Sequence, residues 1–369
     1  MTAFFPSAQA VVPDVRRMAV LRANSIGDFV LAVPALDALR AAYPLAEITY
    51  LGDSWHPQLL ETRPGPWDRV EVVPPYPGIR GDDPTTRTGP AVERFFEAQR
   101  SRRYDLVVQI HGGGGNSNPF AAALGGRVTV GLRDRGAPTL DRWIPYRRYQ
   151  HEICRFLEVV GLVGAAPLGV EPRLSVTRAD EVAAGHALPA RSRPQVALHP
   201  GANDARRRWP VESFAVVADD LTSRGADVVL VGHGRDDERA AGEIARAMRS
   251  QPLNLVGRLS LSAMVGVLAR CSLLVGNDSG PRHLAGAVGT PTVGIYWGRN
   301  LLNTGPLSAG RHEVAVSFQT TCRDCGVDQD AIRCRHESAF VADVTVEEVR
   351  QLVGEHYRRA EGPSGAVSS

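Results

Sequence analysis

The hydrophobic pattern of this chain alternates between two kinds of segment. Short continuous apolar runs are typical of strands buried on both faces, and longer runs with an apolar residue every three or four positions are typical of helices with one buried face. Strands that alternate with helices predict an α/β protein built on parallel sheets. The expected strands are residues 18–21, 48–51, 70–73, 106–110, 128–132, 196–199, 228–231, 273–276 and 292–296, and the expected helices include 91–102, 152–163, 211–224, 238–249, 261–270 and 346–358.

The alternation breaks once, near the middle of the chain. With 369 residues the chain is long enough for two domains that each have their own core. Residues 164–194 contain several prolines and no sustained periodicity, so they are expected to form a linker. We therefore expect two doubly wound parallel-sheet domains, at 1–185 and 186–345, followed by a C-terminal helix and a disordered tail at 346–369.

The turn after the strand at 273–276 is the strongest candidate for a binding element, because a helix follows it directly. Such a turn aims backbone N–H groups and the positive end of the helix dipole at one point, which favours a phosphate. Ser279 can cap the helix, and Gly280 lets a ligand approach the backbone. The alternative is that Asp278 and Ser279 are capping residues only.

Other polar groups follow the neighbouring strands of the second half. His199 and Gly201 come after its first strand, and Arg207 and Arg208 belong to a run of three arginines before the next helix. Such a run is usually solvated surface, but beside a phosphate-binding turn it offers charge to a diphosphate. Glu238 either accepts hydrogen bonds from a ribose diol or only complements a helix dipole.

A polar turn also follows the first strand of the chain. Gly27 permits a tight bend, and the carboxylate of Asp28 either faces a ligand or simply begins the next helix. Pro34 lies inside that helix, where a proline costs a backbone hydrogen bond, so we expect a kink or a late helix start.

Composition narrows the classes of partner. The net charge is only +2, so neither a nucleic acid nor an anionic membrane is required, and at most a peripheral membrane contact is expected. All 42 basic residues are arginine, so a site that needs a fixed cation must use arginine. No signal peptide and no run of about 20 apolar residues is apparent, which predicts a cytoplasmic protein.

In combination, these motifs resemble a known family. The turn at 24–28, followed by Pro34, Ala35 and Leu36, resembles the S-x-G-D…P-A-L signature of the ADP-heptose:lipopolysaccharide heptosyltransferases, glycosyltransferase family 9. The resemblance runs in the family's order from about residue 18 to 298. Its other parts are 199–202, 207–210, 277–280, 283–285 and 289–292.

The resemblance implies a GT-B fold, in which two Rossmann-like domains face each other across a cleft. It also implies an inverting transfer without a metal, with the acceptor on the N-terminal domain and the nucleotide sugar on the C-terminal one. Asp28 matches the general base, and Arg207 falls where the family usually has a lysine. The expected donor-binding residues are His199, Gly201, Arg207, Arg208, Glu238, Asp278, Ser279, Gly280 and His283, and the expected acceptor-binding residues are Asn24, Ser25, Gly27 and His111.

The cysteines are too few and too unevenly placed for a secreted disulfide scaffold. Cys322, Cys325 and Cys334, with His336, could supply four ligands for a structural zinc ion, or could be inherited from the family without binding anything. Apart from that zinc, no cofactor is expected.

Several functions remain open at this point. The leading one is transfer of a heptose or related sugar from an ADP-sugar to a glycan, lipid-linked or small-molecule acceptor. The alternatives are another nucleotide-sugar enzyme, such as a hexosyltransferase or 2-epimerase, and a non-catalytic nucleotide-sugar-binding protein. A nicotinamide-dependent dehydrogenase is disfavoured because neither domain opens with G-x-G-x-x-G.

Overall fold

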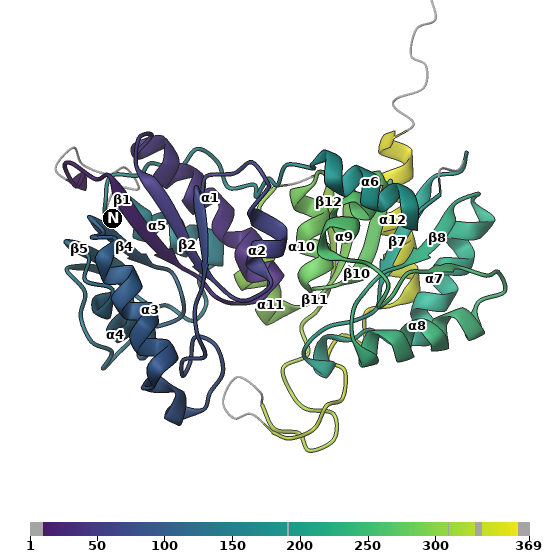
Figure 1. Ribbon diagram of the computed structural model, residues 1–369. Coiled ribbons are helices and arrows are strands. Elements are labelled where there is room, and N and C mark those ends of the chain that lie inside the picture. Colours follow the sequence, from purple (N-terminus) through teal and green to yellow (C-terminus); the bar gives the residue numbers. More distant parts are fainter. Residues whose placement is uncertain (1–9, 190–191, 309, 329–333, 361–369) are drawn as a thin grey trace, which may run out of the picture. The chain divides into compact units, whose positions relative to one another are not determined.

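The computed structural model describes residues 10–189, 192–308, 310–328 and 334–360 (Figure 1). The chain divides into two compact units, Met1–Ser175 and Val176–Ser369. The tail after residue 360, which was expected to be disordered, lies outside the described residues.

The first unit contains a six-stranded sheet in which every strand pair is parallel, with the order β3-β2-β1-β4-β5-β6. Helices α1 and α5 pack against each other. The elements are β1 (Arg17–Leu21), α1 (Ile26–Ala42), β2 (Glu47–Gly52), α2 (His56–Leu60), β3 (Arg69–Val72), the short 3-10 helix η2 (Pro84–Arg87), α3 (Pro90–Ser101), β4 (Leu106–Gln109), α4 (Ser117–Ala123), β5 (Val128–Arg133), β6 (Arg142–Pro145) and α5 (Glu152–Gly161).

The second unit has a six-stranded parallel sheet with the order β12-β11-β10-β7-β8-β9. Its elements are α6 (Arg178–Ala187), β7 (Gln195–His199), the 3-10 helix η3 (Ala205–Arg207), α7 (Val211–Ser223), β8 (Asp227–Leu230), α8 (Arg235–Ala247), β9 (Leu253–Asn254), α9 (Leu261–Arg270), β10 (Leu273–Asn277), α10 (Gly280–Ala287), β11 (Thr292–Trp297), α11 (Gly298–Thr304), β12 (His312–Ser317) and α12 (Val346–Ala360).

The two sheets share one strand order. Numbered within each unit, both read 3-2-1-4-5-6, which is the order of the Rossmann fold. The order reverses between β1 and β4 in the first unit and between β7 and β10 in the second. Ligands of such sheets bind beyond the carboxyl ends of the strands at this reversal. The prediction of an α/β protein with two doubly wound parallel sheets is confirmed.

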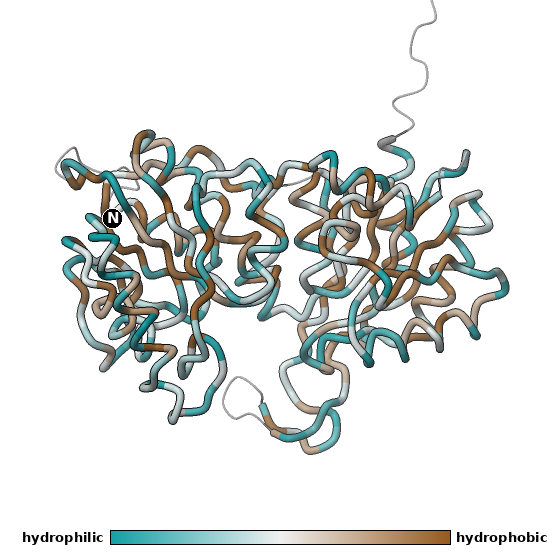
Figure 2. The backbone as a smooth tube through the Cα atoms, in the orientation of Figure 1, coloured by the Kyte–Doolittle hydropathy of each residue, from teal (hydrophilic) through white to brown (hydrophobic). Residues whose placement is uncertain are grey.

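The strands beside the reversal form the centre of each core. All residues of β4, β7 and β10 are buried, as are four of the five residues of β1. Figure 2 shows the central strands as mainly hydrophobic and the outer turns of the helices as more hydrophilic. Because these strands are covered on both faces, they read as continuous apolar runs in the sequence.

Three of the described strands were not predicted from the sequence: β6, β9 and β12. Each is the end strand of its sheet. The residues of β6 alternate between half-buried and exposed, and β9 has only two residues. Four of the six residues of β12 are half-buried. Edge strands that are short or half-exposed carry no continuous apolar run, so the pattern that indicated the central strands does not indicate them.

The short helices α2, α4 and α11 were not expected, and α1 and α6 differ from expectation for reasons that the structure shows. Helix α1 starts at Ile26 and continues through Pro34, so the late start, one of the two effects expected of Pro34, is wrong. A capping box formed by Ser25 and Asp28 fixes the first turn, and Pro34 is buried within the helix's apolar surface. The segment expected to be a linker contains α6. Thr177 and Asp180 form a capping box at its start, which stabilises a helix despite the weak periodicity.

Candidate functional site

The turn predicted to bind phosphate lies at the carboxyl end of β10, next to the end of β7. Asn277, the last residue of β10, is fully buried and joins the two. Its side-chain oxygen accepts a hydrogen bond from the Trp209 backbone N–H at 3.1 Å, and its amide nitrogen donates to the Pro200 carbonyl at 2.7 Å. The loops after β7 and β10 are therefore held together at the reversal of strand order.

The carboxylate of Asp278 is buried at the centre of this region, with 1% of the residue exposed. Its oxygens contact Nη1 of Arg207 at 3.2 Å, Nε2 of His283 at 3.1 Å, Nδ2 of Asn300 at 3.0 Å and Oγ1 of Thr304 at 3.3 Å. Burial alone would raise the pKa of Asp278, but the hydrogen bond from His283 and the neighbouring cations hold it well below its usual range. Asp278 is therefore an anion that fixes the groups around it.

The orientation of His283 follows from its neighbours. Arg282, which is 4% exposed, places Nη2 at 2.5 Å from Nδ1 of His283. A guanidinium can only donate, so Nδ1 accepts and Nε2 carries the hydrogen that is donated to Asp278. The Arg282 guanidinium also lies over the Tyr296 ring, 5.2 Å from its centre. The arginine thereby determines which imidazole nitrogen carries the proton.

Ser279 and Gly280 form the entry to α10. Ser279 is the residue before the helix, but its side chain makes no capping hydrogen bond; its hydroxyl donates to the Asn277 carbonyl at 3.3 Å. The predicted capping by Ser279 is therefore wrong. The Ser279 hydroxyl therefore does not cap the first turn of α10, in which Pro281 has no N–H and the His283 N–H donates to the Ser279 carbonyl at 3.3 Å.

A second carboxylate, Asp237 of α8, occupies the space beside Gly201. A Cβ atom on Gly201 would overlap the Asp237 carboxylate, and one on Gly232 would lie 2.5 Å from its Oδ2 atom. The carboxylate accepts a hydrogen bond from the His233 N–H at 2.9 Å. Gly201 was expected to admit a ligand, and in the structure its missing side chain makes room for Asp237.

The other expected donor residues lie at the ends of β7 and β8 with different partners. His199 is buried and its Nδ1 donates to the Val231 carbonyl at 3.0 Å; burial lowers the pKa of His199. Arg208 donates to the Ala202 carbonyl and pairs with Asp236, both at 2.9 Å. Glu238 is exposed in the first turn of α8. Of the expected donor residues, contacts therefore join Arg207, Asp278 and His283 most directly.

In the first unit, Asp28 lies in the first turn of α1, close to the carboxyl end of β1. Its Oδ2 atom accepts hydrogen bonds from the backbone N–H of Ser25 at 3.2 Å and from the Ser25 hydroxyl at 2.7 Å. Its Oδ1 atom pairs with Nη2 of Arg22 at 2.7 Å. The Asp28 side chain is 31% exposed. The carboxylate is thus held in one orientation and still reaches solvent.

A row of alternating charges extends inward from Asp28. The Arg22 side chain is 4% exposed, donates to the Ile110 carbonyl at 2.8 Å and pairs with Glu152 at 2.9 Å. Glu152 in turn pairs with Arg155, whose side chain is 1% exposed. Burial alone would lower the pKa of Arg22, but Asp28 and Glu152 outweigh burial and raise it. Arg22 therefore remains charged while buried.

The expected acceptor residues surround this row. His111 is buried; its Nδ1 accepts a hydrogen bond from the Ala23 N–H at 3.2 Å, so Nε2 is the nitrogen that donates to the Gly78 carbonyl at 3.1 Å. Burial, assisted by Arg22, lowers the pKa of His111 to about 4. The carbonyl of Asn24 accepts from the Trp55 indole at 3.2 Å, and Gly27 is buried in α1. The structure gives His111 a role in joining loops, and acceptor binding by these residues stays a prediction.

Several residues of these networks were not expected from the sequence. Arg22 and Glu152 are 130 positions apart, and an acid in the first turn of α5 reads as a residue that complements the helix dipole. Asn300 belongs to α11, a helix that the apolar pattern of the sequence did not predict. The one available signal was Arg22 itself, a cation directly after a buried strand.

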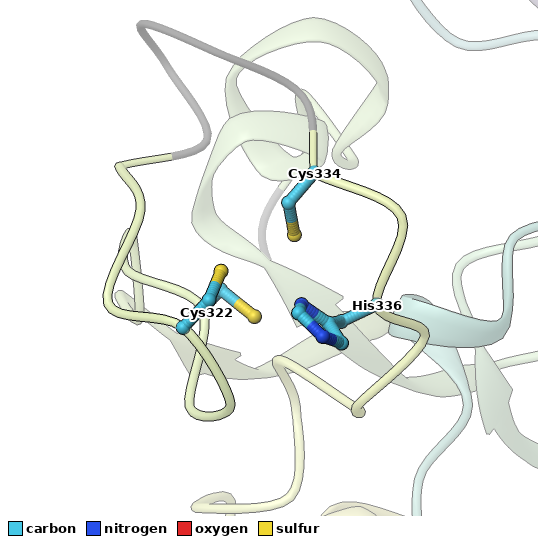
Figure 3. Close-up of side chains that lie close together, drawn as sticks. Cys322, Cys334 and His336 are labelled. Atoms are coloured by element: carbon cyan, nitrogen blue, oxygen red, sulfur yellow. The ribbon is translucent and has the colours of Figure 1, made fainter.

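The four candidate metal ligands do come together. One ligand atom from each of Cys322, Cys325, Cys334 and His336 lies within 4.8 Å of the others. In Figure 3 the side chains of Cys322, Cys334 and His336 point toward one another.

None of the described helices combines the length and the apolar character needed to cross a membrane.

Comparison with known proteins agrees with these features. The family model of glycosyltransferase family 9 (heptosyltransferase) matches residues 92–336. Lipopolysaccharide heptosyltransferase 2 of Salmonella typhimurium is 28% identical over 319 residues, which cover 79% of this chain and 86% of that protein. The Escherichia coli K12 protein of the same name is 27% identical, with the same coverage.

Solved structures give the same result for the fold. A family 9 glycosyltransferase from Veillonella parvula has a TM-score of 0.76 at 22% identity, covering 95% of this chain and 99% of that one. The E. coli ADP-heptose lipopolysaccharide heptosyltransferase II has a TM-score of 0.69 at 21% identity, covering 94% and 99%. The two Rossmann-like units are thus those of a GT-B-like glycosyltransferase, and the chain belongs to glycosyltransferase family 9, the heptosyltransferases.

Proposed function

We propose that this glycosyltransferase moves a heptose from ADP-heptose to a hydroxyl group of a lipopolysaccharide acceptor, with inversion and without a metal at the reacting centre. The similar proteins from Salmonella and E. coli are lipopolysaccharide heptosyltransferases. Structures of a related E. coli heptosyltransferase contain ADP or ADP-2-deoxy-2-fluoro heptose. Both facts favour an ADP-heptose donor and a cytoplasmic location, where nucleotide sugars are made.

The observation that carries the proposal is the fixed cation at the end of β10. Arg207 reaches both the carboxylate of Asp278 at 3.2 Å and its backbone carbonyl at 3.1 Å. The guanidinium therefore stands beside the first turn of α10, which supplies a helix N-terminus. A leaving nucleoside diphosphate gains negative charge as the sugar departs, and a preorganised cation beside backbone N–H groups stabilises that charge.

Asp28 supplies the second half of the reaction. In an inverting transfer, one carboxylate removes the proton of the attacking hydroxyl while the diphosphate leaves from the opposite face. Arg22 and Ser25 orient the Asp28 carboxylate, and its partial exposure keeps it within reach of an acceptor. Since the arginine stabilises the leaving group and the carboxylate takes the proton, this scheme assigns no catalytic step to a metal.

A donor panel tests the proposal. The purified chain is incubated with ADP-heptose, ADP-glucose, UDP-glucose or UDP-N-acetylglucosamine, each with and without a heptose-deficient lipopolysaccharide core, and products are identified by mass spectrometry and NMR. We expect a heptose adduct of inverted anomeric configuration from ADP-heptose only. Release of ADP that needs no acceptor, an epimerised donor, or a hexose adduct would contradict the proposal.

A further inference from the structure

The cysteine-bearing segment after β12 has the geometry of a metal-binding turn. Cys322 and Cys325 flank a tight turn in which the Gly326 N–H donates to the Cys322 carbonyl at 2.8 Å. Gly326 has φ +71°, a left-handed conformation that favours glycine. The Cys322 N–H donates to the Val327 carbonyl at 2.9 Å. Such a turn presents two thiols on the same side of the backbone.

The other two ligands come from a separate part of the segment. Cys334 and His336 approach the turn so that all four ligand atoms lie within 4.8 Å of one another. Ligands around a tetrahedral zinc ion, with bonds of about 2.0 to 2.3 Å, lie about 3.3 to 3.8 Å apart. The four groups therefore need only a small inward shift to complete the shell.

We propose that Cys322, Cys325, Cys334 and His336 bind one divalent transition metal, with zinc as the expected ion, and that the site is structural. The proposal does not depend on the reaction that the enzyme catalyses. Three thiolates and an imidazole fill a tetrahedral shell and leave no open position for a substrate, which is the property of a structural site.

Burial supports this assignment. Cys322 is 2% exposed and belongs to the hydrophobic core of the second unit, and Cys334 packs against that core. Cys325 and His336 are exposed, so a metal can enter from solvent. Contacts with the core thus hold the segment at Cys322 and Cys334. Four metal bonds would add stability at the exposed ligands as well.

The position of the segment also links it to the loop that carries Arg207. Beyond His336, the Phe340 N–H donates to the carbonyl of Arg206 at 2.8 Å, and the Phe340 ring stacks on Trp297 with centres 4.7 Å apart. A metal that fixes the segment up to His336 thereby steadies the residue that precedes Arg207. We expect metal removal to weaken nucleotide binding secondarily.

Metal analysis of the full-length chain, made without an affinity tag and freed of loosely bound ions, tests the site. Cys325→Ser and His336→Ala each remove one exposed ligand, because replacing the buried Cys322 endangers folding itself. Cys154→Ser, a change at a half-buried cysteine of α5 in the first unit, is the matched control. Substitution with cobalt adds a spectroscopic readout, since thiolate ligands give an intense charge-transfer band.

The wild type and Cys154→Ser are expected to hold about one metal per chain and to show the cobalt–thiolate band. Removal of a residue that only hydrogen-bonds to a metal ligand weakens metal binding about 10- to 100-fold. Removal of a ligand itself should cost more, so Cys325→Ser and His336→Ala should each lower the affinity by at least about 100-fold. One equivalent of iron in place of zinc would support the site with a different ion. Metal-free wild type, a disulfide between these cysteines, or metal retained in both ligand variants would overturn the proposal.

Discussion

Asp28 and Asp278 lie beside the reversal of strand order in two sheets of the same topology, yet their surroundings differ sharply. The side chain of Asp28 is 31% exposed, whereas that of Asp278 is 2% exposed. Asp28 contacts Arg22 and Ser25, and Asp278 is enclosed by Arg207, a histidine, an amide and a hydroxyl. This difference in burial and partners distinguishes two aspartates that look alike in the sequence motifs.

An enclosed carboxylate and an accessible one do different chemistry. The donors around Asp278 stabilise its charged form so strongly that it cannot take up a proton near neutral pH. We therefore expect Asp278 to orient the cations beside it and not to exchange a proton during the reaction. The side chain of Asp28 is partly exposed, and the buried charges of Arg22, Glu152 and Arg155 hold its carboxylate on the inner side. The comparison predicts that Asp278 matters most for stability and Asp28 for turnover.

The largest expected effect is on the stability of the second unit. Asp278→Ala leaves the partly buried Arg207 and the buried Arg282 without their anion, which should lower the free energy of unfolding by about 3–5 kcal/mol. Asp28→Ala removes a partly exposed capping acid, and Arg22 keeps Glu152 and the Ile110 carbonyl, so its cost should be about 0.5–2 kcal/mol. Unfolding in urea measures both losses, and hydrogen exchange in β7 and β1 assigns each loss to its unit.

The pH dependence provides an independent check on Asp278. Its folded pKa lies below the unfolded value of about 3.9, so its contribution is fully present above that pH and is lost as the pH falls toward the folded pKa. The stability difference between wild type and Asp278→Ala should therefore shrink below about pH 4. Equal stability losses for the two aspartate variants at pH 7 would contradict the comparison.

The second effect is on turnover. Asp28→Ala should lower kcat by about 10²-fold or more, because no carboxylate remains to accept the hydroxyl proton, while the Kd for ADP measured by calorimetry stays within about twofold of wild type. Asp28→Asn keeps the size and the hydrogen bond from Ser25, and should lose as much turnover. A variant of either kind that retains wild-type kcat would remove Asp28 from the mechanism.

The central parts of the fold were predictable because the local sequence pattern and the burial in the core favour the same elements there. The fully buried β4, β7 and β10 are continuous apolar runs, and α5, α7 and α9 begin within a residue of their predicted positions. Edge strands such as β6 are stabilised by pairing with one neighbour, and that pairing leaves little trace in the local sequence. The helix α1 shows the converse: a cap and a packed apolar surface outweigh a proline.

The sequence indicated single candidate residues of the sites, but not the side chains that contact them. The motifs identified Asp28, Arg207 and Asp278 because each lies in a turn after a buried strand. Their partners are distant: Arg22 meets Glu152 across 130 positions, and Asp278 meets Asn300 across 22. The burial that separates the two aspartates depends on those partners, and for that reason the sequence presents both as equivalent helix-starting acids.

The smallest effect should be on donor affinity, and it tests whether Arg207 acts on the ligand or only balances Asp278. Arg207→Ala should weaken ADP binding about 10-fold, the cost of one charge-assisted contact of about 1.4 kcal/mol. Arg224→Ala is the control: Arg224 also pairs with an aspartate, Asp220, at 2.8 Å, but it is 46% exposed at the end of α7. Such a surface pair contributes little, so this variant should bind ADP as the wild type does. Because Arg207 touches the phosphates in this account, AMP should lose much less affinity than ADP in Arg207→Ala. An equal loss for AMP and ADP would show that the arginine supports the fold of the loop and does not contact the diphosphate.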